Sequence, residues 1–100
     1  MNETRWYVMF LERGKNYNKM TKAIAQQHVD NIRALDDAGK LALCGAFRGY
    51  PGMAGMLILQ TETREEAEEI CRNEPLVALG YATYQLRDFL PANRENNYLM

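Results

Sequence analysis

The run Trp6-Tyr7-Val8-Met9-Phe10-Leu11 carries more information about the architecture of this chain than any other segment. It is short, rich in aromatic residues and followed by Gly14, which predicts a β-strand. Successive side chains of a strand point to opposite faces, so residues 6, 8 and 10 form one apolar face and residues 7, 9 and 11 the other. A strand of this kind needs an apolar cover on both sides of its sheet.

The rest of the chain predicts helices and strands. Residues 21–38 repeat apolar side chains at helical spacing and end at Gly39, where glycine can adopt the positive φ of a helix terminus. Thr63 and Glu66 form a capping box that begins a second helix. The expected order is strand, helix, strand, strand, helix and strand, at residues 6–11, 21–38, 41–47, 56–60, 63–72 and 81–89. The expected connections are a polar loop at 14–20, a turn-rich loop at 48–55, an irregular or 3₁₀ segment at 75–80 and an irregular tail at 90–100.

This order predicts the ferredoxin-like βαββαβ arrangement, an α+β fold in which a four-stranded antiparallel sheet carries both helices on one face. In three of the predicted strands both faces are apolar. In the strand at 41–47, Leu41 and Leu43 are expected on one face and Cys44 on the other. Two short helices cannot cover both sides of the sheet. We therefore expect a homodimer in which two sheets pack face to face, a dimeric α+β barrel.

Composition limits the kind of protein this is. The 100 residues suffice for one domain with a small core, which we place at residues 1–100. A net charge of −1 argues against nucleic-acid binding, which needs a basic surface to neutralise phosphates. No apolar run approaches the roughly 20 residues of a membrane span, and residues 1–5 lack the apolar stretch of a signal peptide. We expect a cytoplasmic protein that binds no membrane.

No strong catalytic or metal-binding motif occurs in the chain. The four glycines between positions 45 and 55 match neither the dinucleotide fingerprint nor the P-loop, and one histidine cannot supply a typical zinc site. We expect no metal and no cofactor. Cys44 and Cys71 form no C-x-x-C pair and are expected to be buried free thiols. A nucleophilic Cys44 with His28 as its partner stays open.

A few polar residues at the ends of the predicted elements are candidates for function. His28 shares a helix face with Ile24, Ile32 and Leu35, so it is either a hydrogen-bonded core residue or a group that handles protons in a pocket. Glu74 follows the second helix. Arg48 and Tyr50 open the longest loop between strands, where Arg48 is either a surface charge or an anchor for an anionic substrate.

Several segments, taken in order, resemble a known family. They are Tyr7-Val8-Met9-Phe10, Asp37-Ala38-Gly39-Lys40-Leu41, Gly45, Gly55 before the third strand, Glu65-x-Ala67, and Glu74-Pro75-Leu76-Val77-x-x-Gly80-Tyr81. Their order and spacing are similar to those of the YciI-related family of YCII-like domains, from the first strand to about residue 89.

The resemblance implies a ferredoxin-like domain that dimerises through its sheet. In the family, the histidine of the first helix and the aspartate of an Asp-Pro step are proposed to form a catalytic dyad, which implies His28 and Glu74 here, with glutamate in place of aspartate. Members with an assigned activity resemble lyases or dehalogenases that act on small aromatic rings, and the fold also resembles muconolactone isomerases.

A small cofactor-free enzyme follows as the leading hypothesis. His28 would transfer a proton as general acid or base, Glu74 would fix its tautomer, and Arg48 and Tyr50 would bind a small organic substrate such as an acid or a phenol. The alternative is a dimeric small-ligand-binding or accessory module without chemistry, in which His28 is a buried hydrogen-bonding residue. A haem- or quinol-handling monooxygenase is a weaker third interpretation, because no axial ligand besides His28 is evident.

Overall fold

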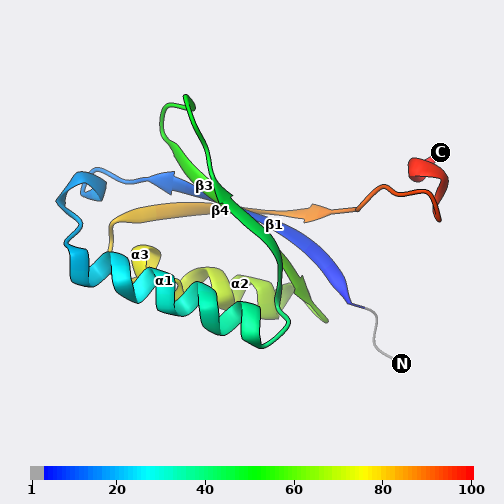
Figure 1. Cartoon of the computed structure of the whole chain (residues 1–100), viewed down its shortest axis with the longest axis horizontal. Coiled ribbons are helices and arrows are strands. Elements are labelled where there is room, and N and C mark those ends of the chain that lie inside the picture. The colour runs from blue at the N-terminus through cyan, green and yellow to red at the C-terminus, as the bar shows by residue number, and fades with distance from the viewer. Residues whose placement is uncertain (1–3) are drawn as a thin grey trace.

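In the computed structural model, which describes residues 4–100, a four-stranded antiparallel sheet carries its α-helices on one face (Figure 1). Residues 1–3, part of the segment expected to lack a signal peptide, lie outside the described residues. The strands are β1 (Arg5–Arg13), β2 (Leu41–Ala46), β3 (Met53–Thr61) and β4 (Ala82–Phe89). The helices are α1 (Lys22–Asp37), α2 (Arg64–Asn73) and α3 (Pro75–Ala78), with short 3₁₀ turns η1 (Tyr17–Lys19) and η2 (Asn97–Leu99). The predicted ferredoxin-like α+β fold is confirmed.

The strand order is β2-β3-β1-β4, so the apolar run at the start of the chain occupies the middle of the sheet. β1 is antiparallel to both of its neighbours, with Met9 opposite Leu57 on β3 and Leu86 on β4. These three side chains lie in the buried core between the sheet and the helices. None of the helices within residues 4–100 has the length and apolar character needed to cross a bilayer.

The two long helices bury their inner faces to different degrees. α2 places Ala67 and Cys71 in the core with no exposed surface. α1 has no buried residue, although its Ile24, Ile32 and Leu35 touch the core. α1 therefore contacts the core through part-buried side chains, and a cavity lies beneath part of the helix.

Among residues 4–100, no helix lies on the opposite face of the sheet (Figure 1). This face is apolar over β1 to β3 and polar at β4, where Gln85 and Arg87 lie beside Phe10 and Val8. Trp6, Val8 and Phe10 of β1 alternate with the core residues of that strand, and Val8 pairs with Ile58 and Phe10 with Met56. Leu43 on β2 continues this outer face and is 59% exposed. The apolar side chains that predict a second cover for the sheet thus lie together on the face without helices.

The structure corrects the predicted faces of β2. The strand pairing shifts register between Leu41 and Leu43, so Leu41 points to the core while Leu43 points outward. The prediction that these two leucines share a face is wrong, because a bulge breaks the two-residue period of a strand. Cys44 consequently faces the helices.

Two connections differ from the prediction. β3 begins at Met53 rather than at residue 56, which shortens the loop between the second and third strands. Residues 75–78 form one turn of α-helix instead of an irregular or 3₁₀ segment. Pro75 is suited to the first turn of a helix, and the Glu74 side chain accepts a hydrogen bond from the Leu76 amide.

The tail after β4 leads away from the sheet and the helices (Figure 1). Asn93 and Asn96 exchange side-chain to backbone hydrogen bonds, each 3.0 Å long. The three residues of η2 all have positive φ, from 51° to 71°. The expected irregular tail thus contains a short left-handed turn.

Close approach of β2 and β3 explains the glycine at position 55. A Cβ atom on Gly55 would lie 2.4 Å from the carbonyl oxygen of Gly45, which belongs to the backbone and cannot rotate away. A Cβ atom on Gly45 itself would meet no atom within 4 Å. The two glycines therefore have different steric roles in the same hairpin.

We expect Gly55→Ala to lower the free energy of unfolding by about 1–3 kcal/mol, because the added methyl group forces the strands apart. Gly45→Ala is the matched control and should leave the denaturant midpoint nearly unchanged or slightly raised. Urea unfolding followed by circular dichroism measures both. Equal midpoints for the two variants would contradict the steric explanation.

Candidate functional site

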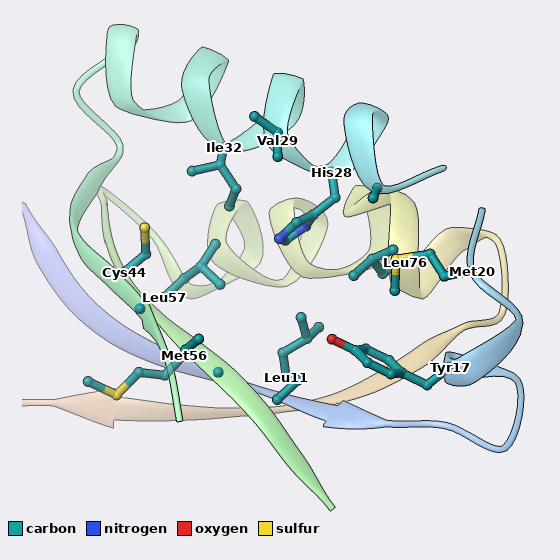
Figure 2. A pocket seen from close by; sticks show the side chains of 15 residues that line it. Leu11, Tyr17, Met20, His28, Val29, Ile32, Cys44, Met56, Leu57 and Leu76 are labelled. Atoms are coloured by element: carbon teal, nitrogen blue, oxygen red, sulfur yellow. The ribbon is translucent and has the colours of Figure 1, made fainter. Parts of the chain in front are cut away.

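A cavity of about 430 Å³ lies between the N-terminal half of α1 and the sheet (Figure 2). Its sheet side is formed by small residues of the β2–β3 hairpin, Gly45, Ala46, Ala54 and Gly55, and its helix side includes Ala25. Side chains this small cannot fill the space between helix and sheet. The cavity is in the size range of sites for small molecules.

The walls of the cavity are mainly apolar. Leu11, Leu57 and Leu76 contribute core side chains, and Val29 and Ile32 descend from α1 (Figure 2). Three side chains that can take part in polar chemistry also line it: Tyr17, His28 and Cys44. No group of three His, Cys, Asp or Glu suited to a metal ion occurs among residues 4–100.

His28 and Glu74 form a hydrogen-bonded pair at the wall of this cavity. Nδ1 of His28 donates to Oε1 of Glu74 across a separation of 46 residues in sequence. The His28 side chain is 27% exposed, whereas that of Glu74 is completely buried. The imidazole therefore lies between the buried carboxylate and the open space of the cavity.

Glu74 uses both of its carboxylate oxygens. Oε1 accepts from His28, and Oε2 accepts from the amide of Leu76 at 2.7 Å. A buried carboxylate needs such partners because burial without them costs several kcal/mol. The position between α2 and α3, in extended conformation, lets the longer glutamate side chain reach the imidazole.

The structure does not bring Arg48 and Tyr50 to the cavity. Both lie in the turn between β2 and β3, and neither belongs to the lining formed by the described residues. Tyr50 is 49% exposed and packs against Phe47, with a ring separation of 5.1 Å. Their role in substrate binding stays a prediction.

The two cysteines occupy different environments. Cys71 is buried without exposed surface, as expected, and burial raises the pKa of its thiol to about 12. Cys44 is exposed, contrary to the prediction, because it lies on the edge strand β2 and faces the open cavity. Cys44 and His28 thus line one cavity, although the structure gives no direct contact between them within residues 4–100.

Sequence reasoning missed Tyr17, which lines the cavity from η1. The segment 14–20 reads as a polar loop because asparagine and lysine dominate it. An aromatic residue inside such a loop, close after a core strand, was the available signal.

Comparison with known proteins agrees with this fold. The model of the YCII-related domain matches residues 6–90, and the chain belongs to that family. The resemblance drawn from the sequence is thereby confirmed. Among curated proteins, the sequence comparison finds no match.

A solved structure shows the same fold. It is that of 5-chloro-2-hydroxyhydroquinone dehydrochlorinase (TftG) from Burkholderia phenoliruptrix AC1100, in complex with 2,5-dihydroxybenzoquinone. The superposition has a TM-score of 0.73 and covers 92% of this chain and 99% of that one. The two sequences are 13% identical, so the likeness concerns the fold.

We expect the two thiols to react at very different rates with a thiol reagent such as Ellman's reagent near pH 8. The thiolate is the reactive species, and a thiol with a pKa of about 12 stays protonated at that pH. Cys44 should react in the folded protein and Cys71 only after unfolding in denaturant. Cys44→Ser should abolish the rapid phase. Two rapid thiols in the folded protein would contradict this assignment.

Proposed function

We propose that this protein is a small enzyme that needs no cofactor and transfers a proton on a small hydroxylated ring. The observation that carries this proposal is the hydrogen bond from His28 to the buried Glu74 at the wall of an apolar cavity. In a binding module without chemistry, the same pair would serve only to cap α3 and hold α1 in place, and the exchange experiment below distinguishes the two roles.

The division of work within the pair follows from its hydrogen bonds. With Nδ1 donating to Glu74, the neutral imidazole carries its proton on Nδ1, and Nε2 has a free lone pair. Nε2 can take a proton from a bound molecule and return it, while the carboxylate holds the ring in place and stabilises the imidazolium that forms. Such general acid–base catalysis contributes about 10²- to 10⁴-fold.

The lining of the cavity supports a substrate with an apolar ring. No lysine or arginine belongs to the lining that residues 4–100 provide, so a multiply charged anion would lack a partner there. TftG acts on a chlorinated hydroxylated ring, and its structure holds a dihydroxybenzoquinone. By analogy of fold, phenols and hydroxyquinones are the substrate class we assign to this chain.

Proton transfer is tested directly by deuterium exchange. 2,5-Dihydroxybenzoquinone is incubated with the protein in heavy water, and loss of its ring hydrogens is followed by NMR. We expect acceleration by the unaltered protein and a fall of about 10²- to 10⁴-fold in His28→Gln. Gln27→Ala, a change at the neighbouring exposed residue of α1, is the control and should retain the rate.

The same experiment separates the proposal from its alternatives. Binding of the quinone without catalysed exchange in the unaltered protein favours a ligand-binding module. Equal exchange rates in the unaltered protein and in His28→Gln refute the role of the histidine. Loss of activity in Cys44→Ser with retention in His28→Gln points to thiol chemistry at the other side of the cavity.

We further propose that two copies pack through the outer faces of their sheets, in the cytoplasm. Support comes from the apolar residues of that face, Trp6, Val8, Phe10, Met56 and Ile58, which no helix covers (Figure 1). Val8 and Ile58 are already buried within one chain, but Trp6, Phe10 and Met56 are part-exposed and Leu43 is 59% exposed. Exposed apolar surface of this kind favours association. A two-fold contact places the same patch on both partners.

Sedimentation at micromolar concentration is expected to give the mass of two chains. Phe10→Glu should shift the mass to one chain, because it places a charge at the centre of the apolar face without touching the core side of β1. Leu79→Glu is the matched control, since Leu79 is a half-exposed apolar residue that follows α3. A one-chain mass for the unaltered protein would refute the dimer.

A further inference from the structure

Tyr17 faces His28 across the cavity. It belongs to η1, the turn between β1 and α1, and its hydroxyl points into the cavity from the level of the sheet, whereas His28 descends from the helix (Figure 2). Within the lining formed by residues 4–100, these two side chains carry the nitrogen and oxygen atoms, and the other lining side chains are apolar or sulfur-bearing.

Two backbone hydrogen bonds hold the turn that carries Tyr17. The Gly14 amide donates to the carbonyl of Tyr81 at 3.1 Å, and the Tyr17 amide donates to the carbonyl of Gly14 at 3.1 Å. Gly14 packs so closely that a Cβ atom there would lie 2.9 Å from the Tyr81 carbonyl oxygen. The turn that carries Tyr17 is thereby tied to the start of β4.

The ring of Tyr17 is also held from one side. The guanidinium carbon of Arg13 lies 5.4 Å from the ring centroid, a cation–π contact. The same guanidinium donates to the carbonyl of Met53 at 3.1 Å, which links it to β3. The hydroxyl itself makes no hydrogen bond to any residue in the described range 4–100. Tyr17 therefore presents an oriented, unpaired hydroxyl to the cavity.

We propose that the Tyr17 hydroxyl binds an oxygen substituent of the substrate, so that the cavity selects small rings with two oxygen substituents. This inference rests on the proposed function, in which His28 engages the first oxygen or an adjacent ring position. A phenol hydroxyl can both donate and accept, so it can pair with a hydroxyl or a carbonyl. A ring without the second oxygen would leave the Tyr17 hydroxyl unpaired against an apolar ligand.

The inference is tested by a cycle in which one oxygen is removed from the protein and one from the ligand. The affinities of phenol and of its three hydroxy derivatives, catechol, resorcinol and hydroquinone, are measured by calorimetry. Dissolved O₂ is removed from the buffers so that the diols are not oxidised. We expect the unaltered protein to bind at least one of the diols about 3- to 10-fold more tightly than phenol. Tyr17→Phe should abolish this preference while leaving the affinity for phenol unchanged. Tyr98→Phe, in the tail, is the control.

Each other outcome overturns the inference. An equal loss for phenol and diols in Tyr17→Phe shows that Tyr17 acts through packing. A preference for a diol that survives in Tyr17→Phe shows that another group binds the second oxygen. Equal affinities for phenol and all three diols in the unaltered protein, or no binding of any diol at millimolar concentration, refute the substrate class. Because calorimetry needs no turnover, failure of proton transfer in the deuterium experiment is recognised independently.

Discussion

The buried carboxylate of Glu74 is the interaction around which this domain is organised. It lies where α2 passes into α3, and it accepts hydrogen bonds from the Leu76 amide of α3 and from the imidazole on α1 at the same time. A carboxylate without exposed surface and without those partners would be strongly destabilising. The requirement to pair this group therefore fixes the position of α1 relative to α3, and with it the depth of the cavity between α1 and the sheet.

The layer of side chains between the helices and the sheet is closely packed in one half and open in the other. Beneath α2, the alanine, the cysteine and the leucines of β1 and β3 pack closely. Beneath the first half of α1, glycine and alanine on the β2–β3 hairpin leave the space open, and the helix buries none of its residues there. The tightly packed residues beneath α2 thus contribute most to the core. The space beneath the first half of α1 can hold a ligand.

Most of the fold could be predicted from the sequence, because the signals were local. The two-sided apolar run of β1, Gly39 after the first helix and Thr63 before the second each depend on near neighbours in the chain. The bulge in β2 could not be predicted, since it arises from pairing with β3 and reverses the side on which Cys44 lies. The four-residue helix α3 was missed although Glu74 and Pro75 are local signals, because four residues are too few to show a helical repeat of apolar side chains.

The candidate site was predictable to the extent that a motif marked it. His28 was a candidate because of its place on an apolar helix face, the family resemblance suggested Glu74 as its partner, and the structure shows a hydrogen bond between them. Arg48 and Tyr50 were predicted to bind substrate because they lie in the longest loop between strands. Position in a loop does not show whether that loop points toward the cavity. Tyr17 is brought to the cavity by the contact of Gly14 with Tyr81, a pairing of residues 67 positions apart that no local pattern records.

The small residues on the sheet side of the cavity have a consequence for how such a domain diverges. Because Ala46 and Ala54 make no polar contact with the His28–Glu74 pair, larger side chains at these positions would narrow the cavity and leave the pair intact. The shape of the cavity and the chemistry at its wall are therefore encoded by separate residues. Substitutions at these positions can therefore change the outline of the cavity while the His28–Glu74 hydrogen bond is kept.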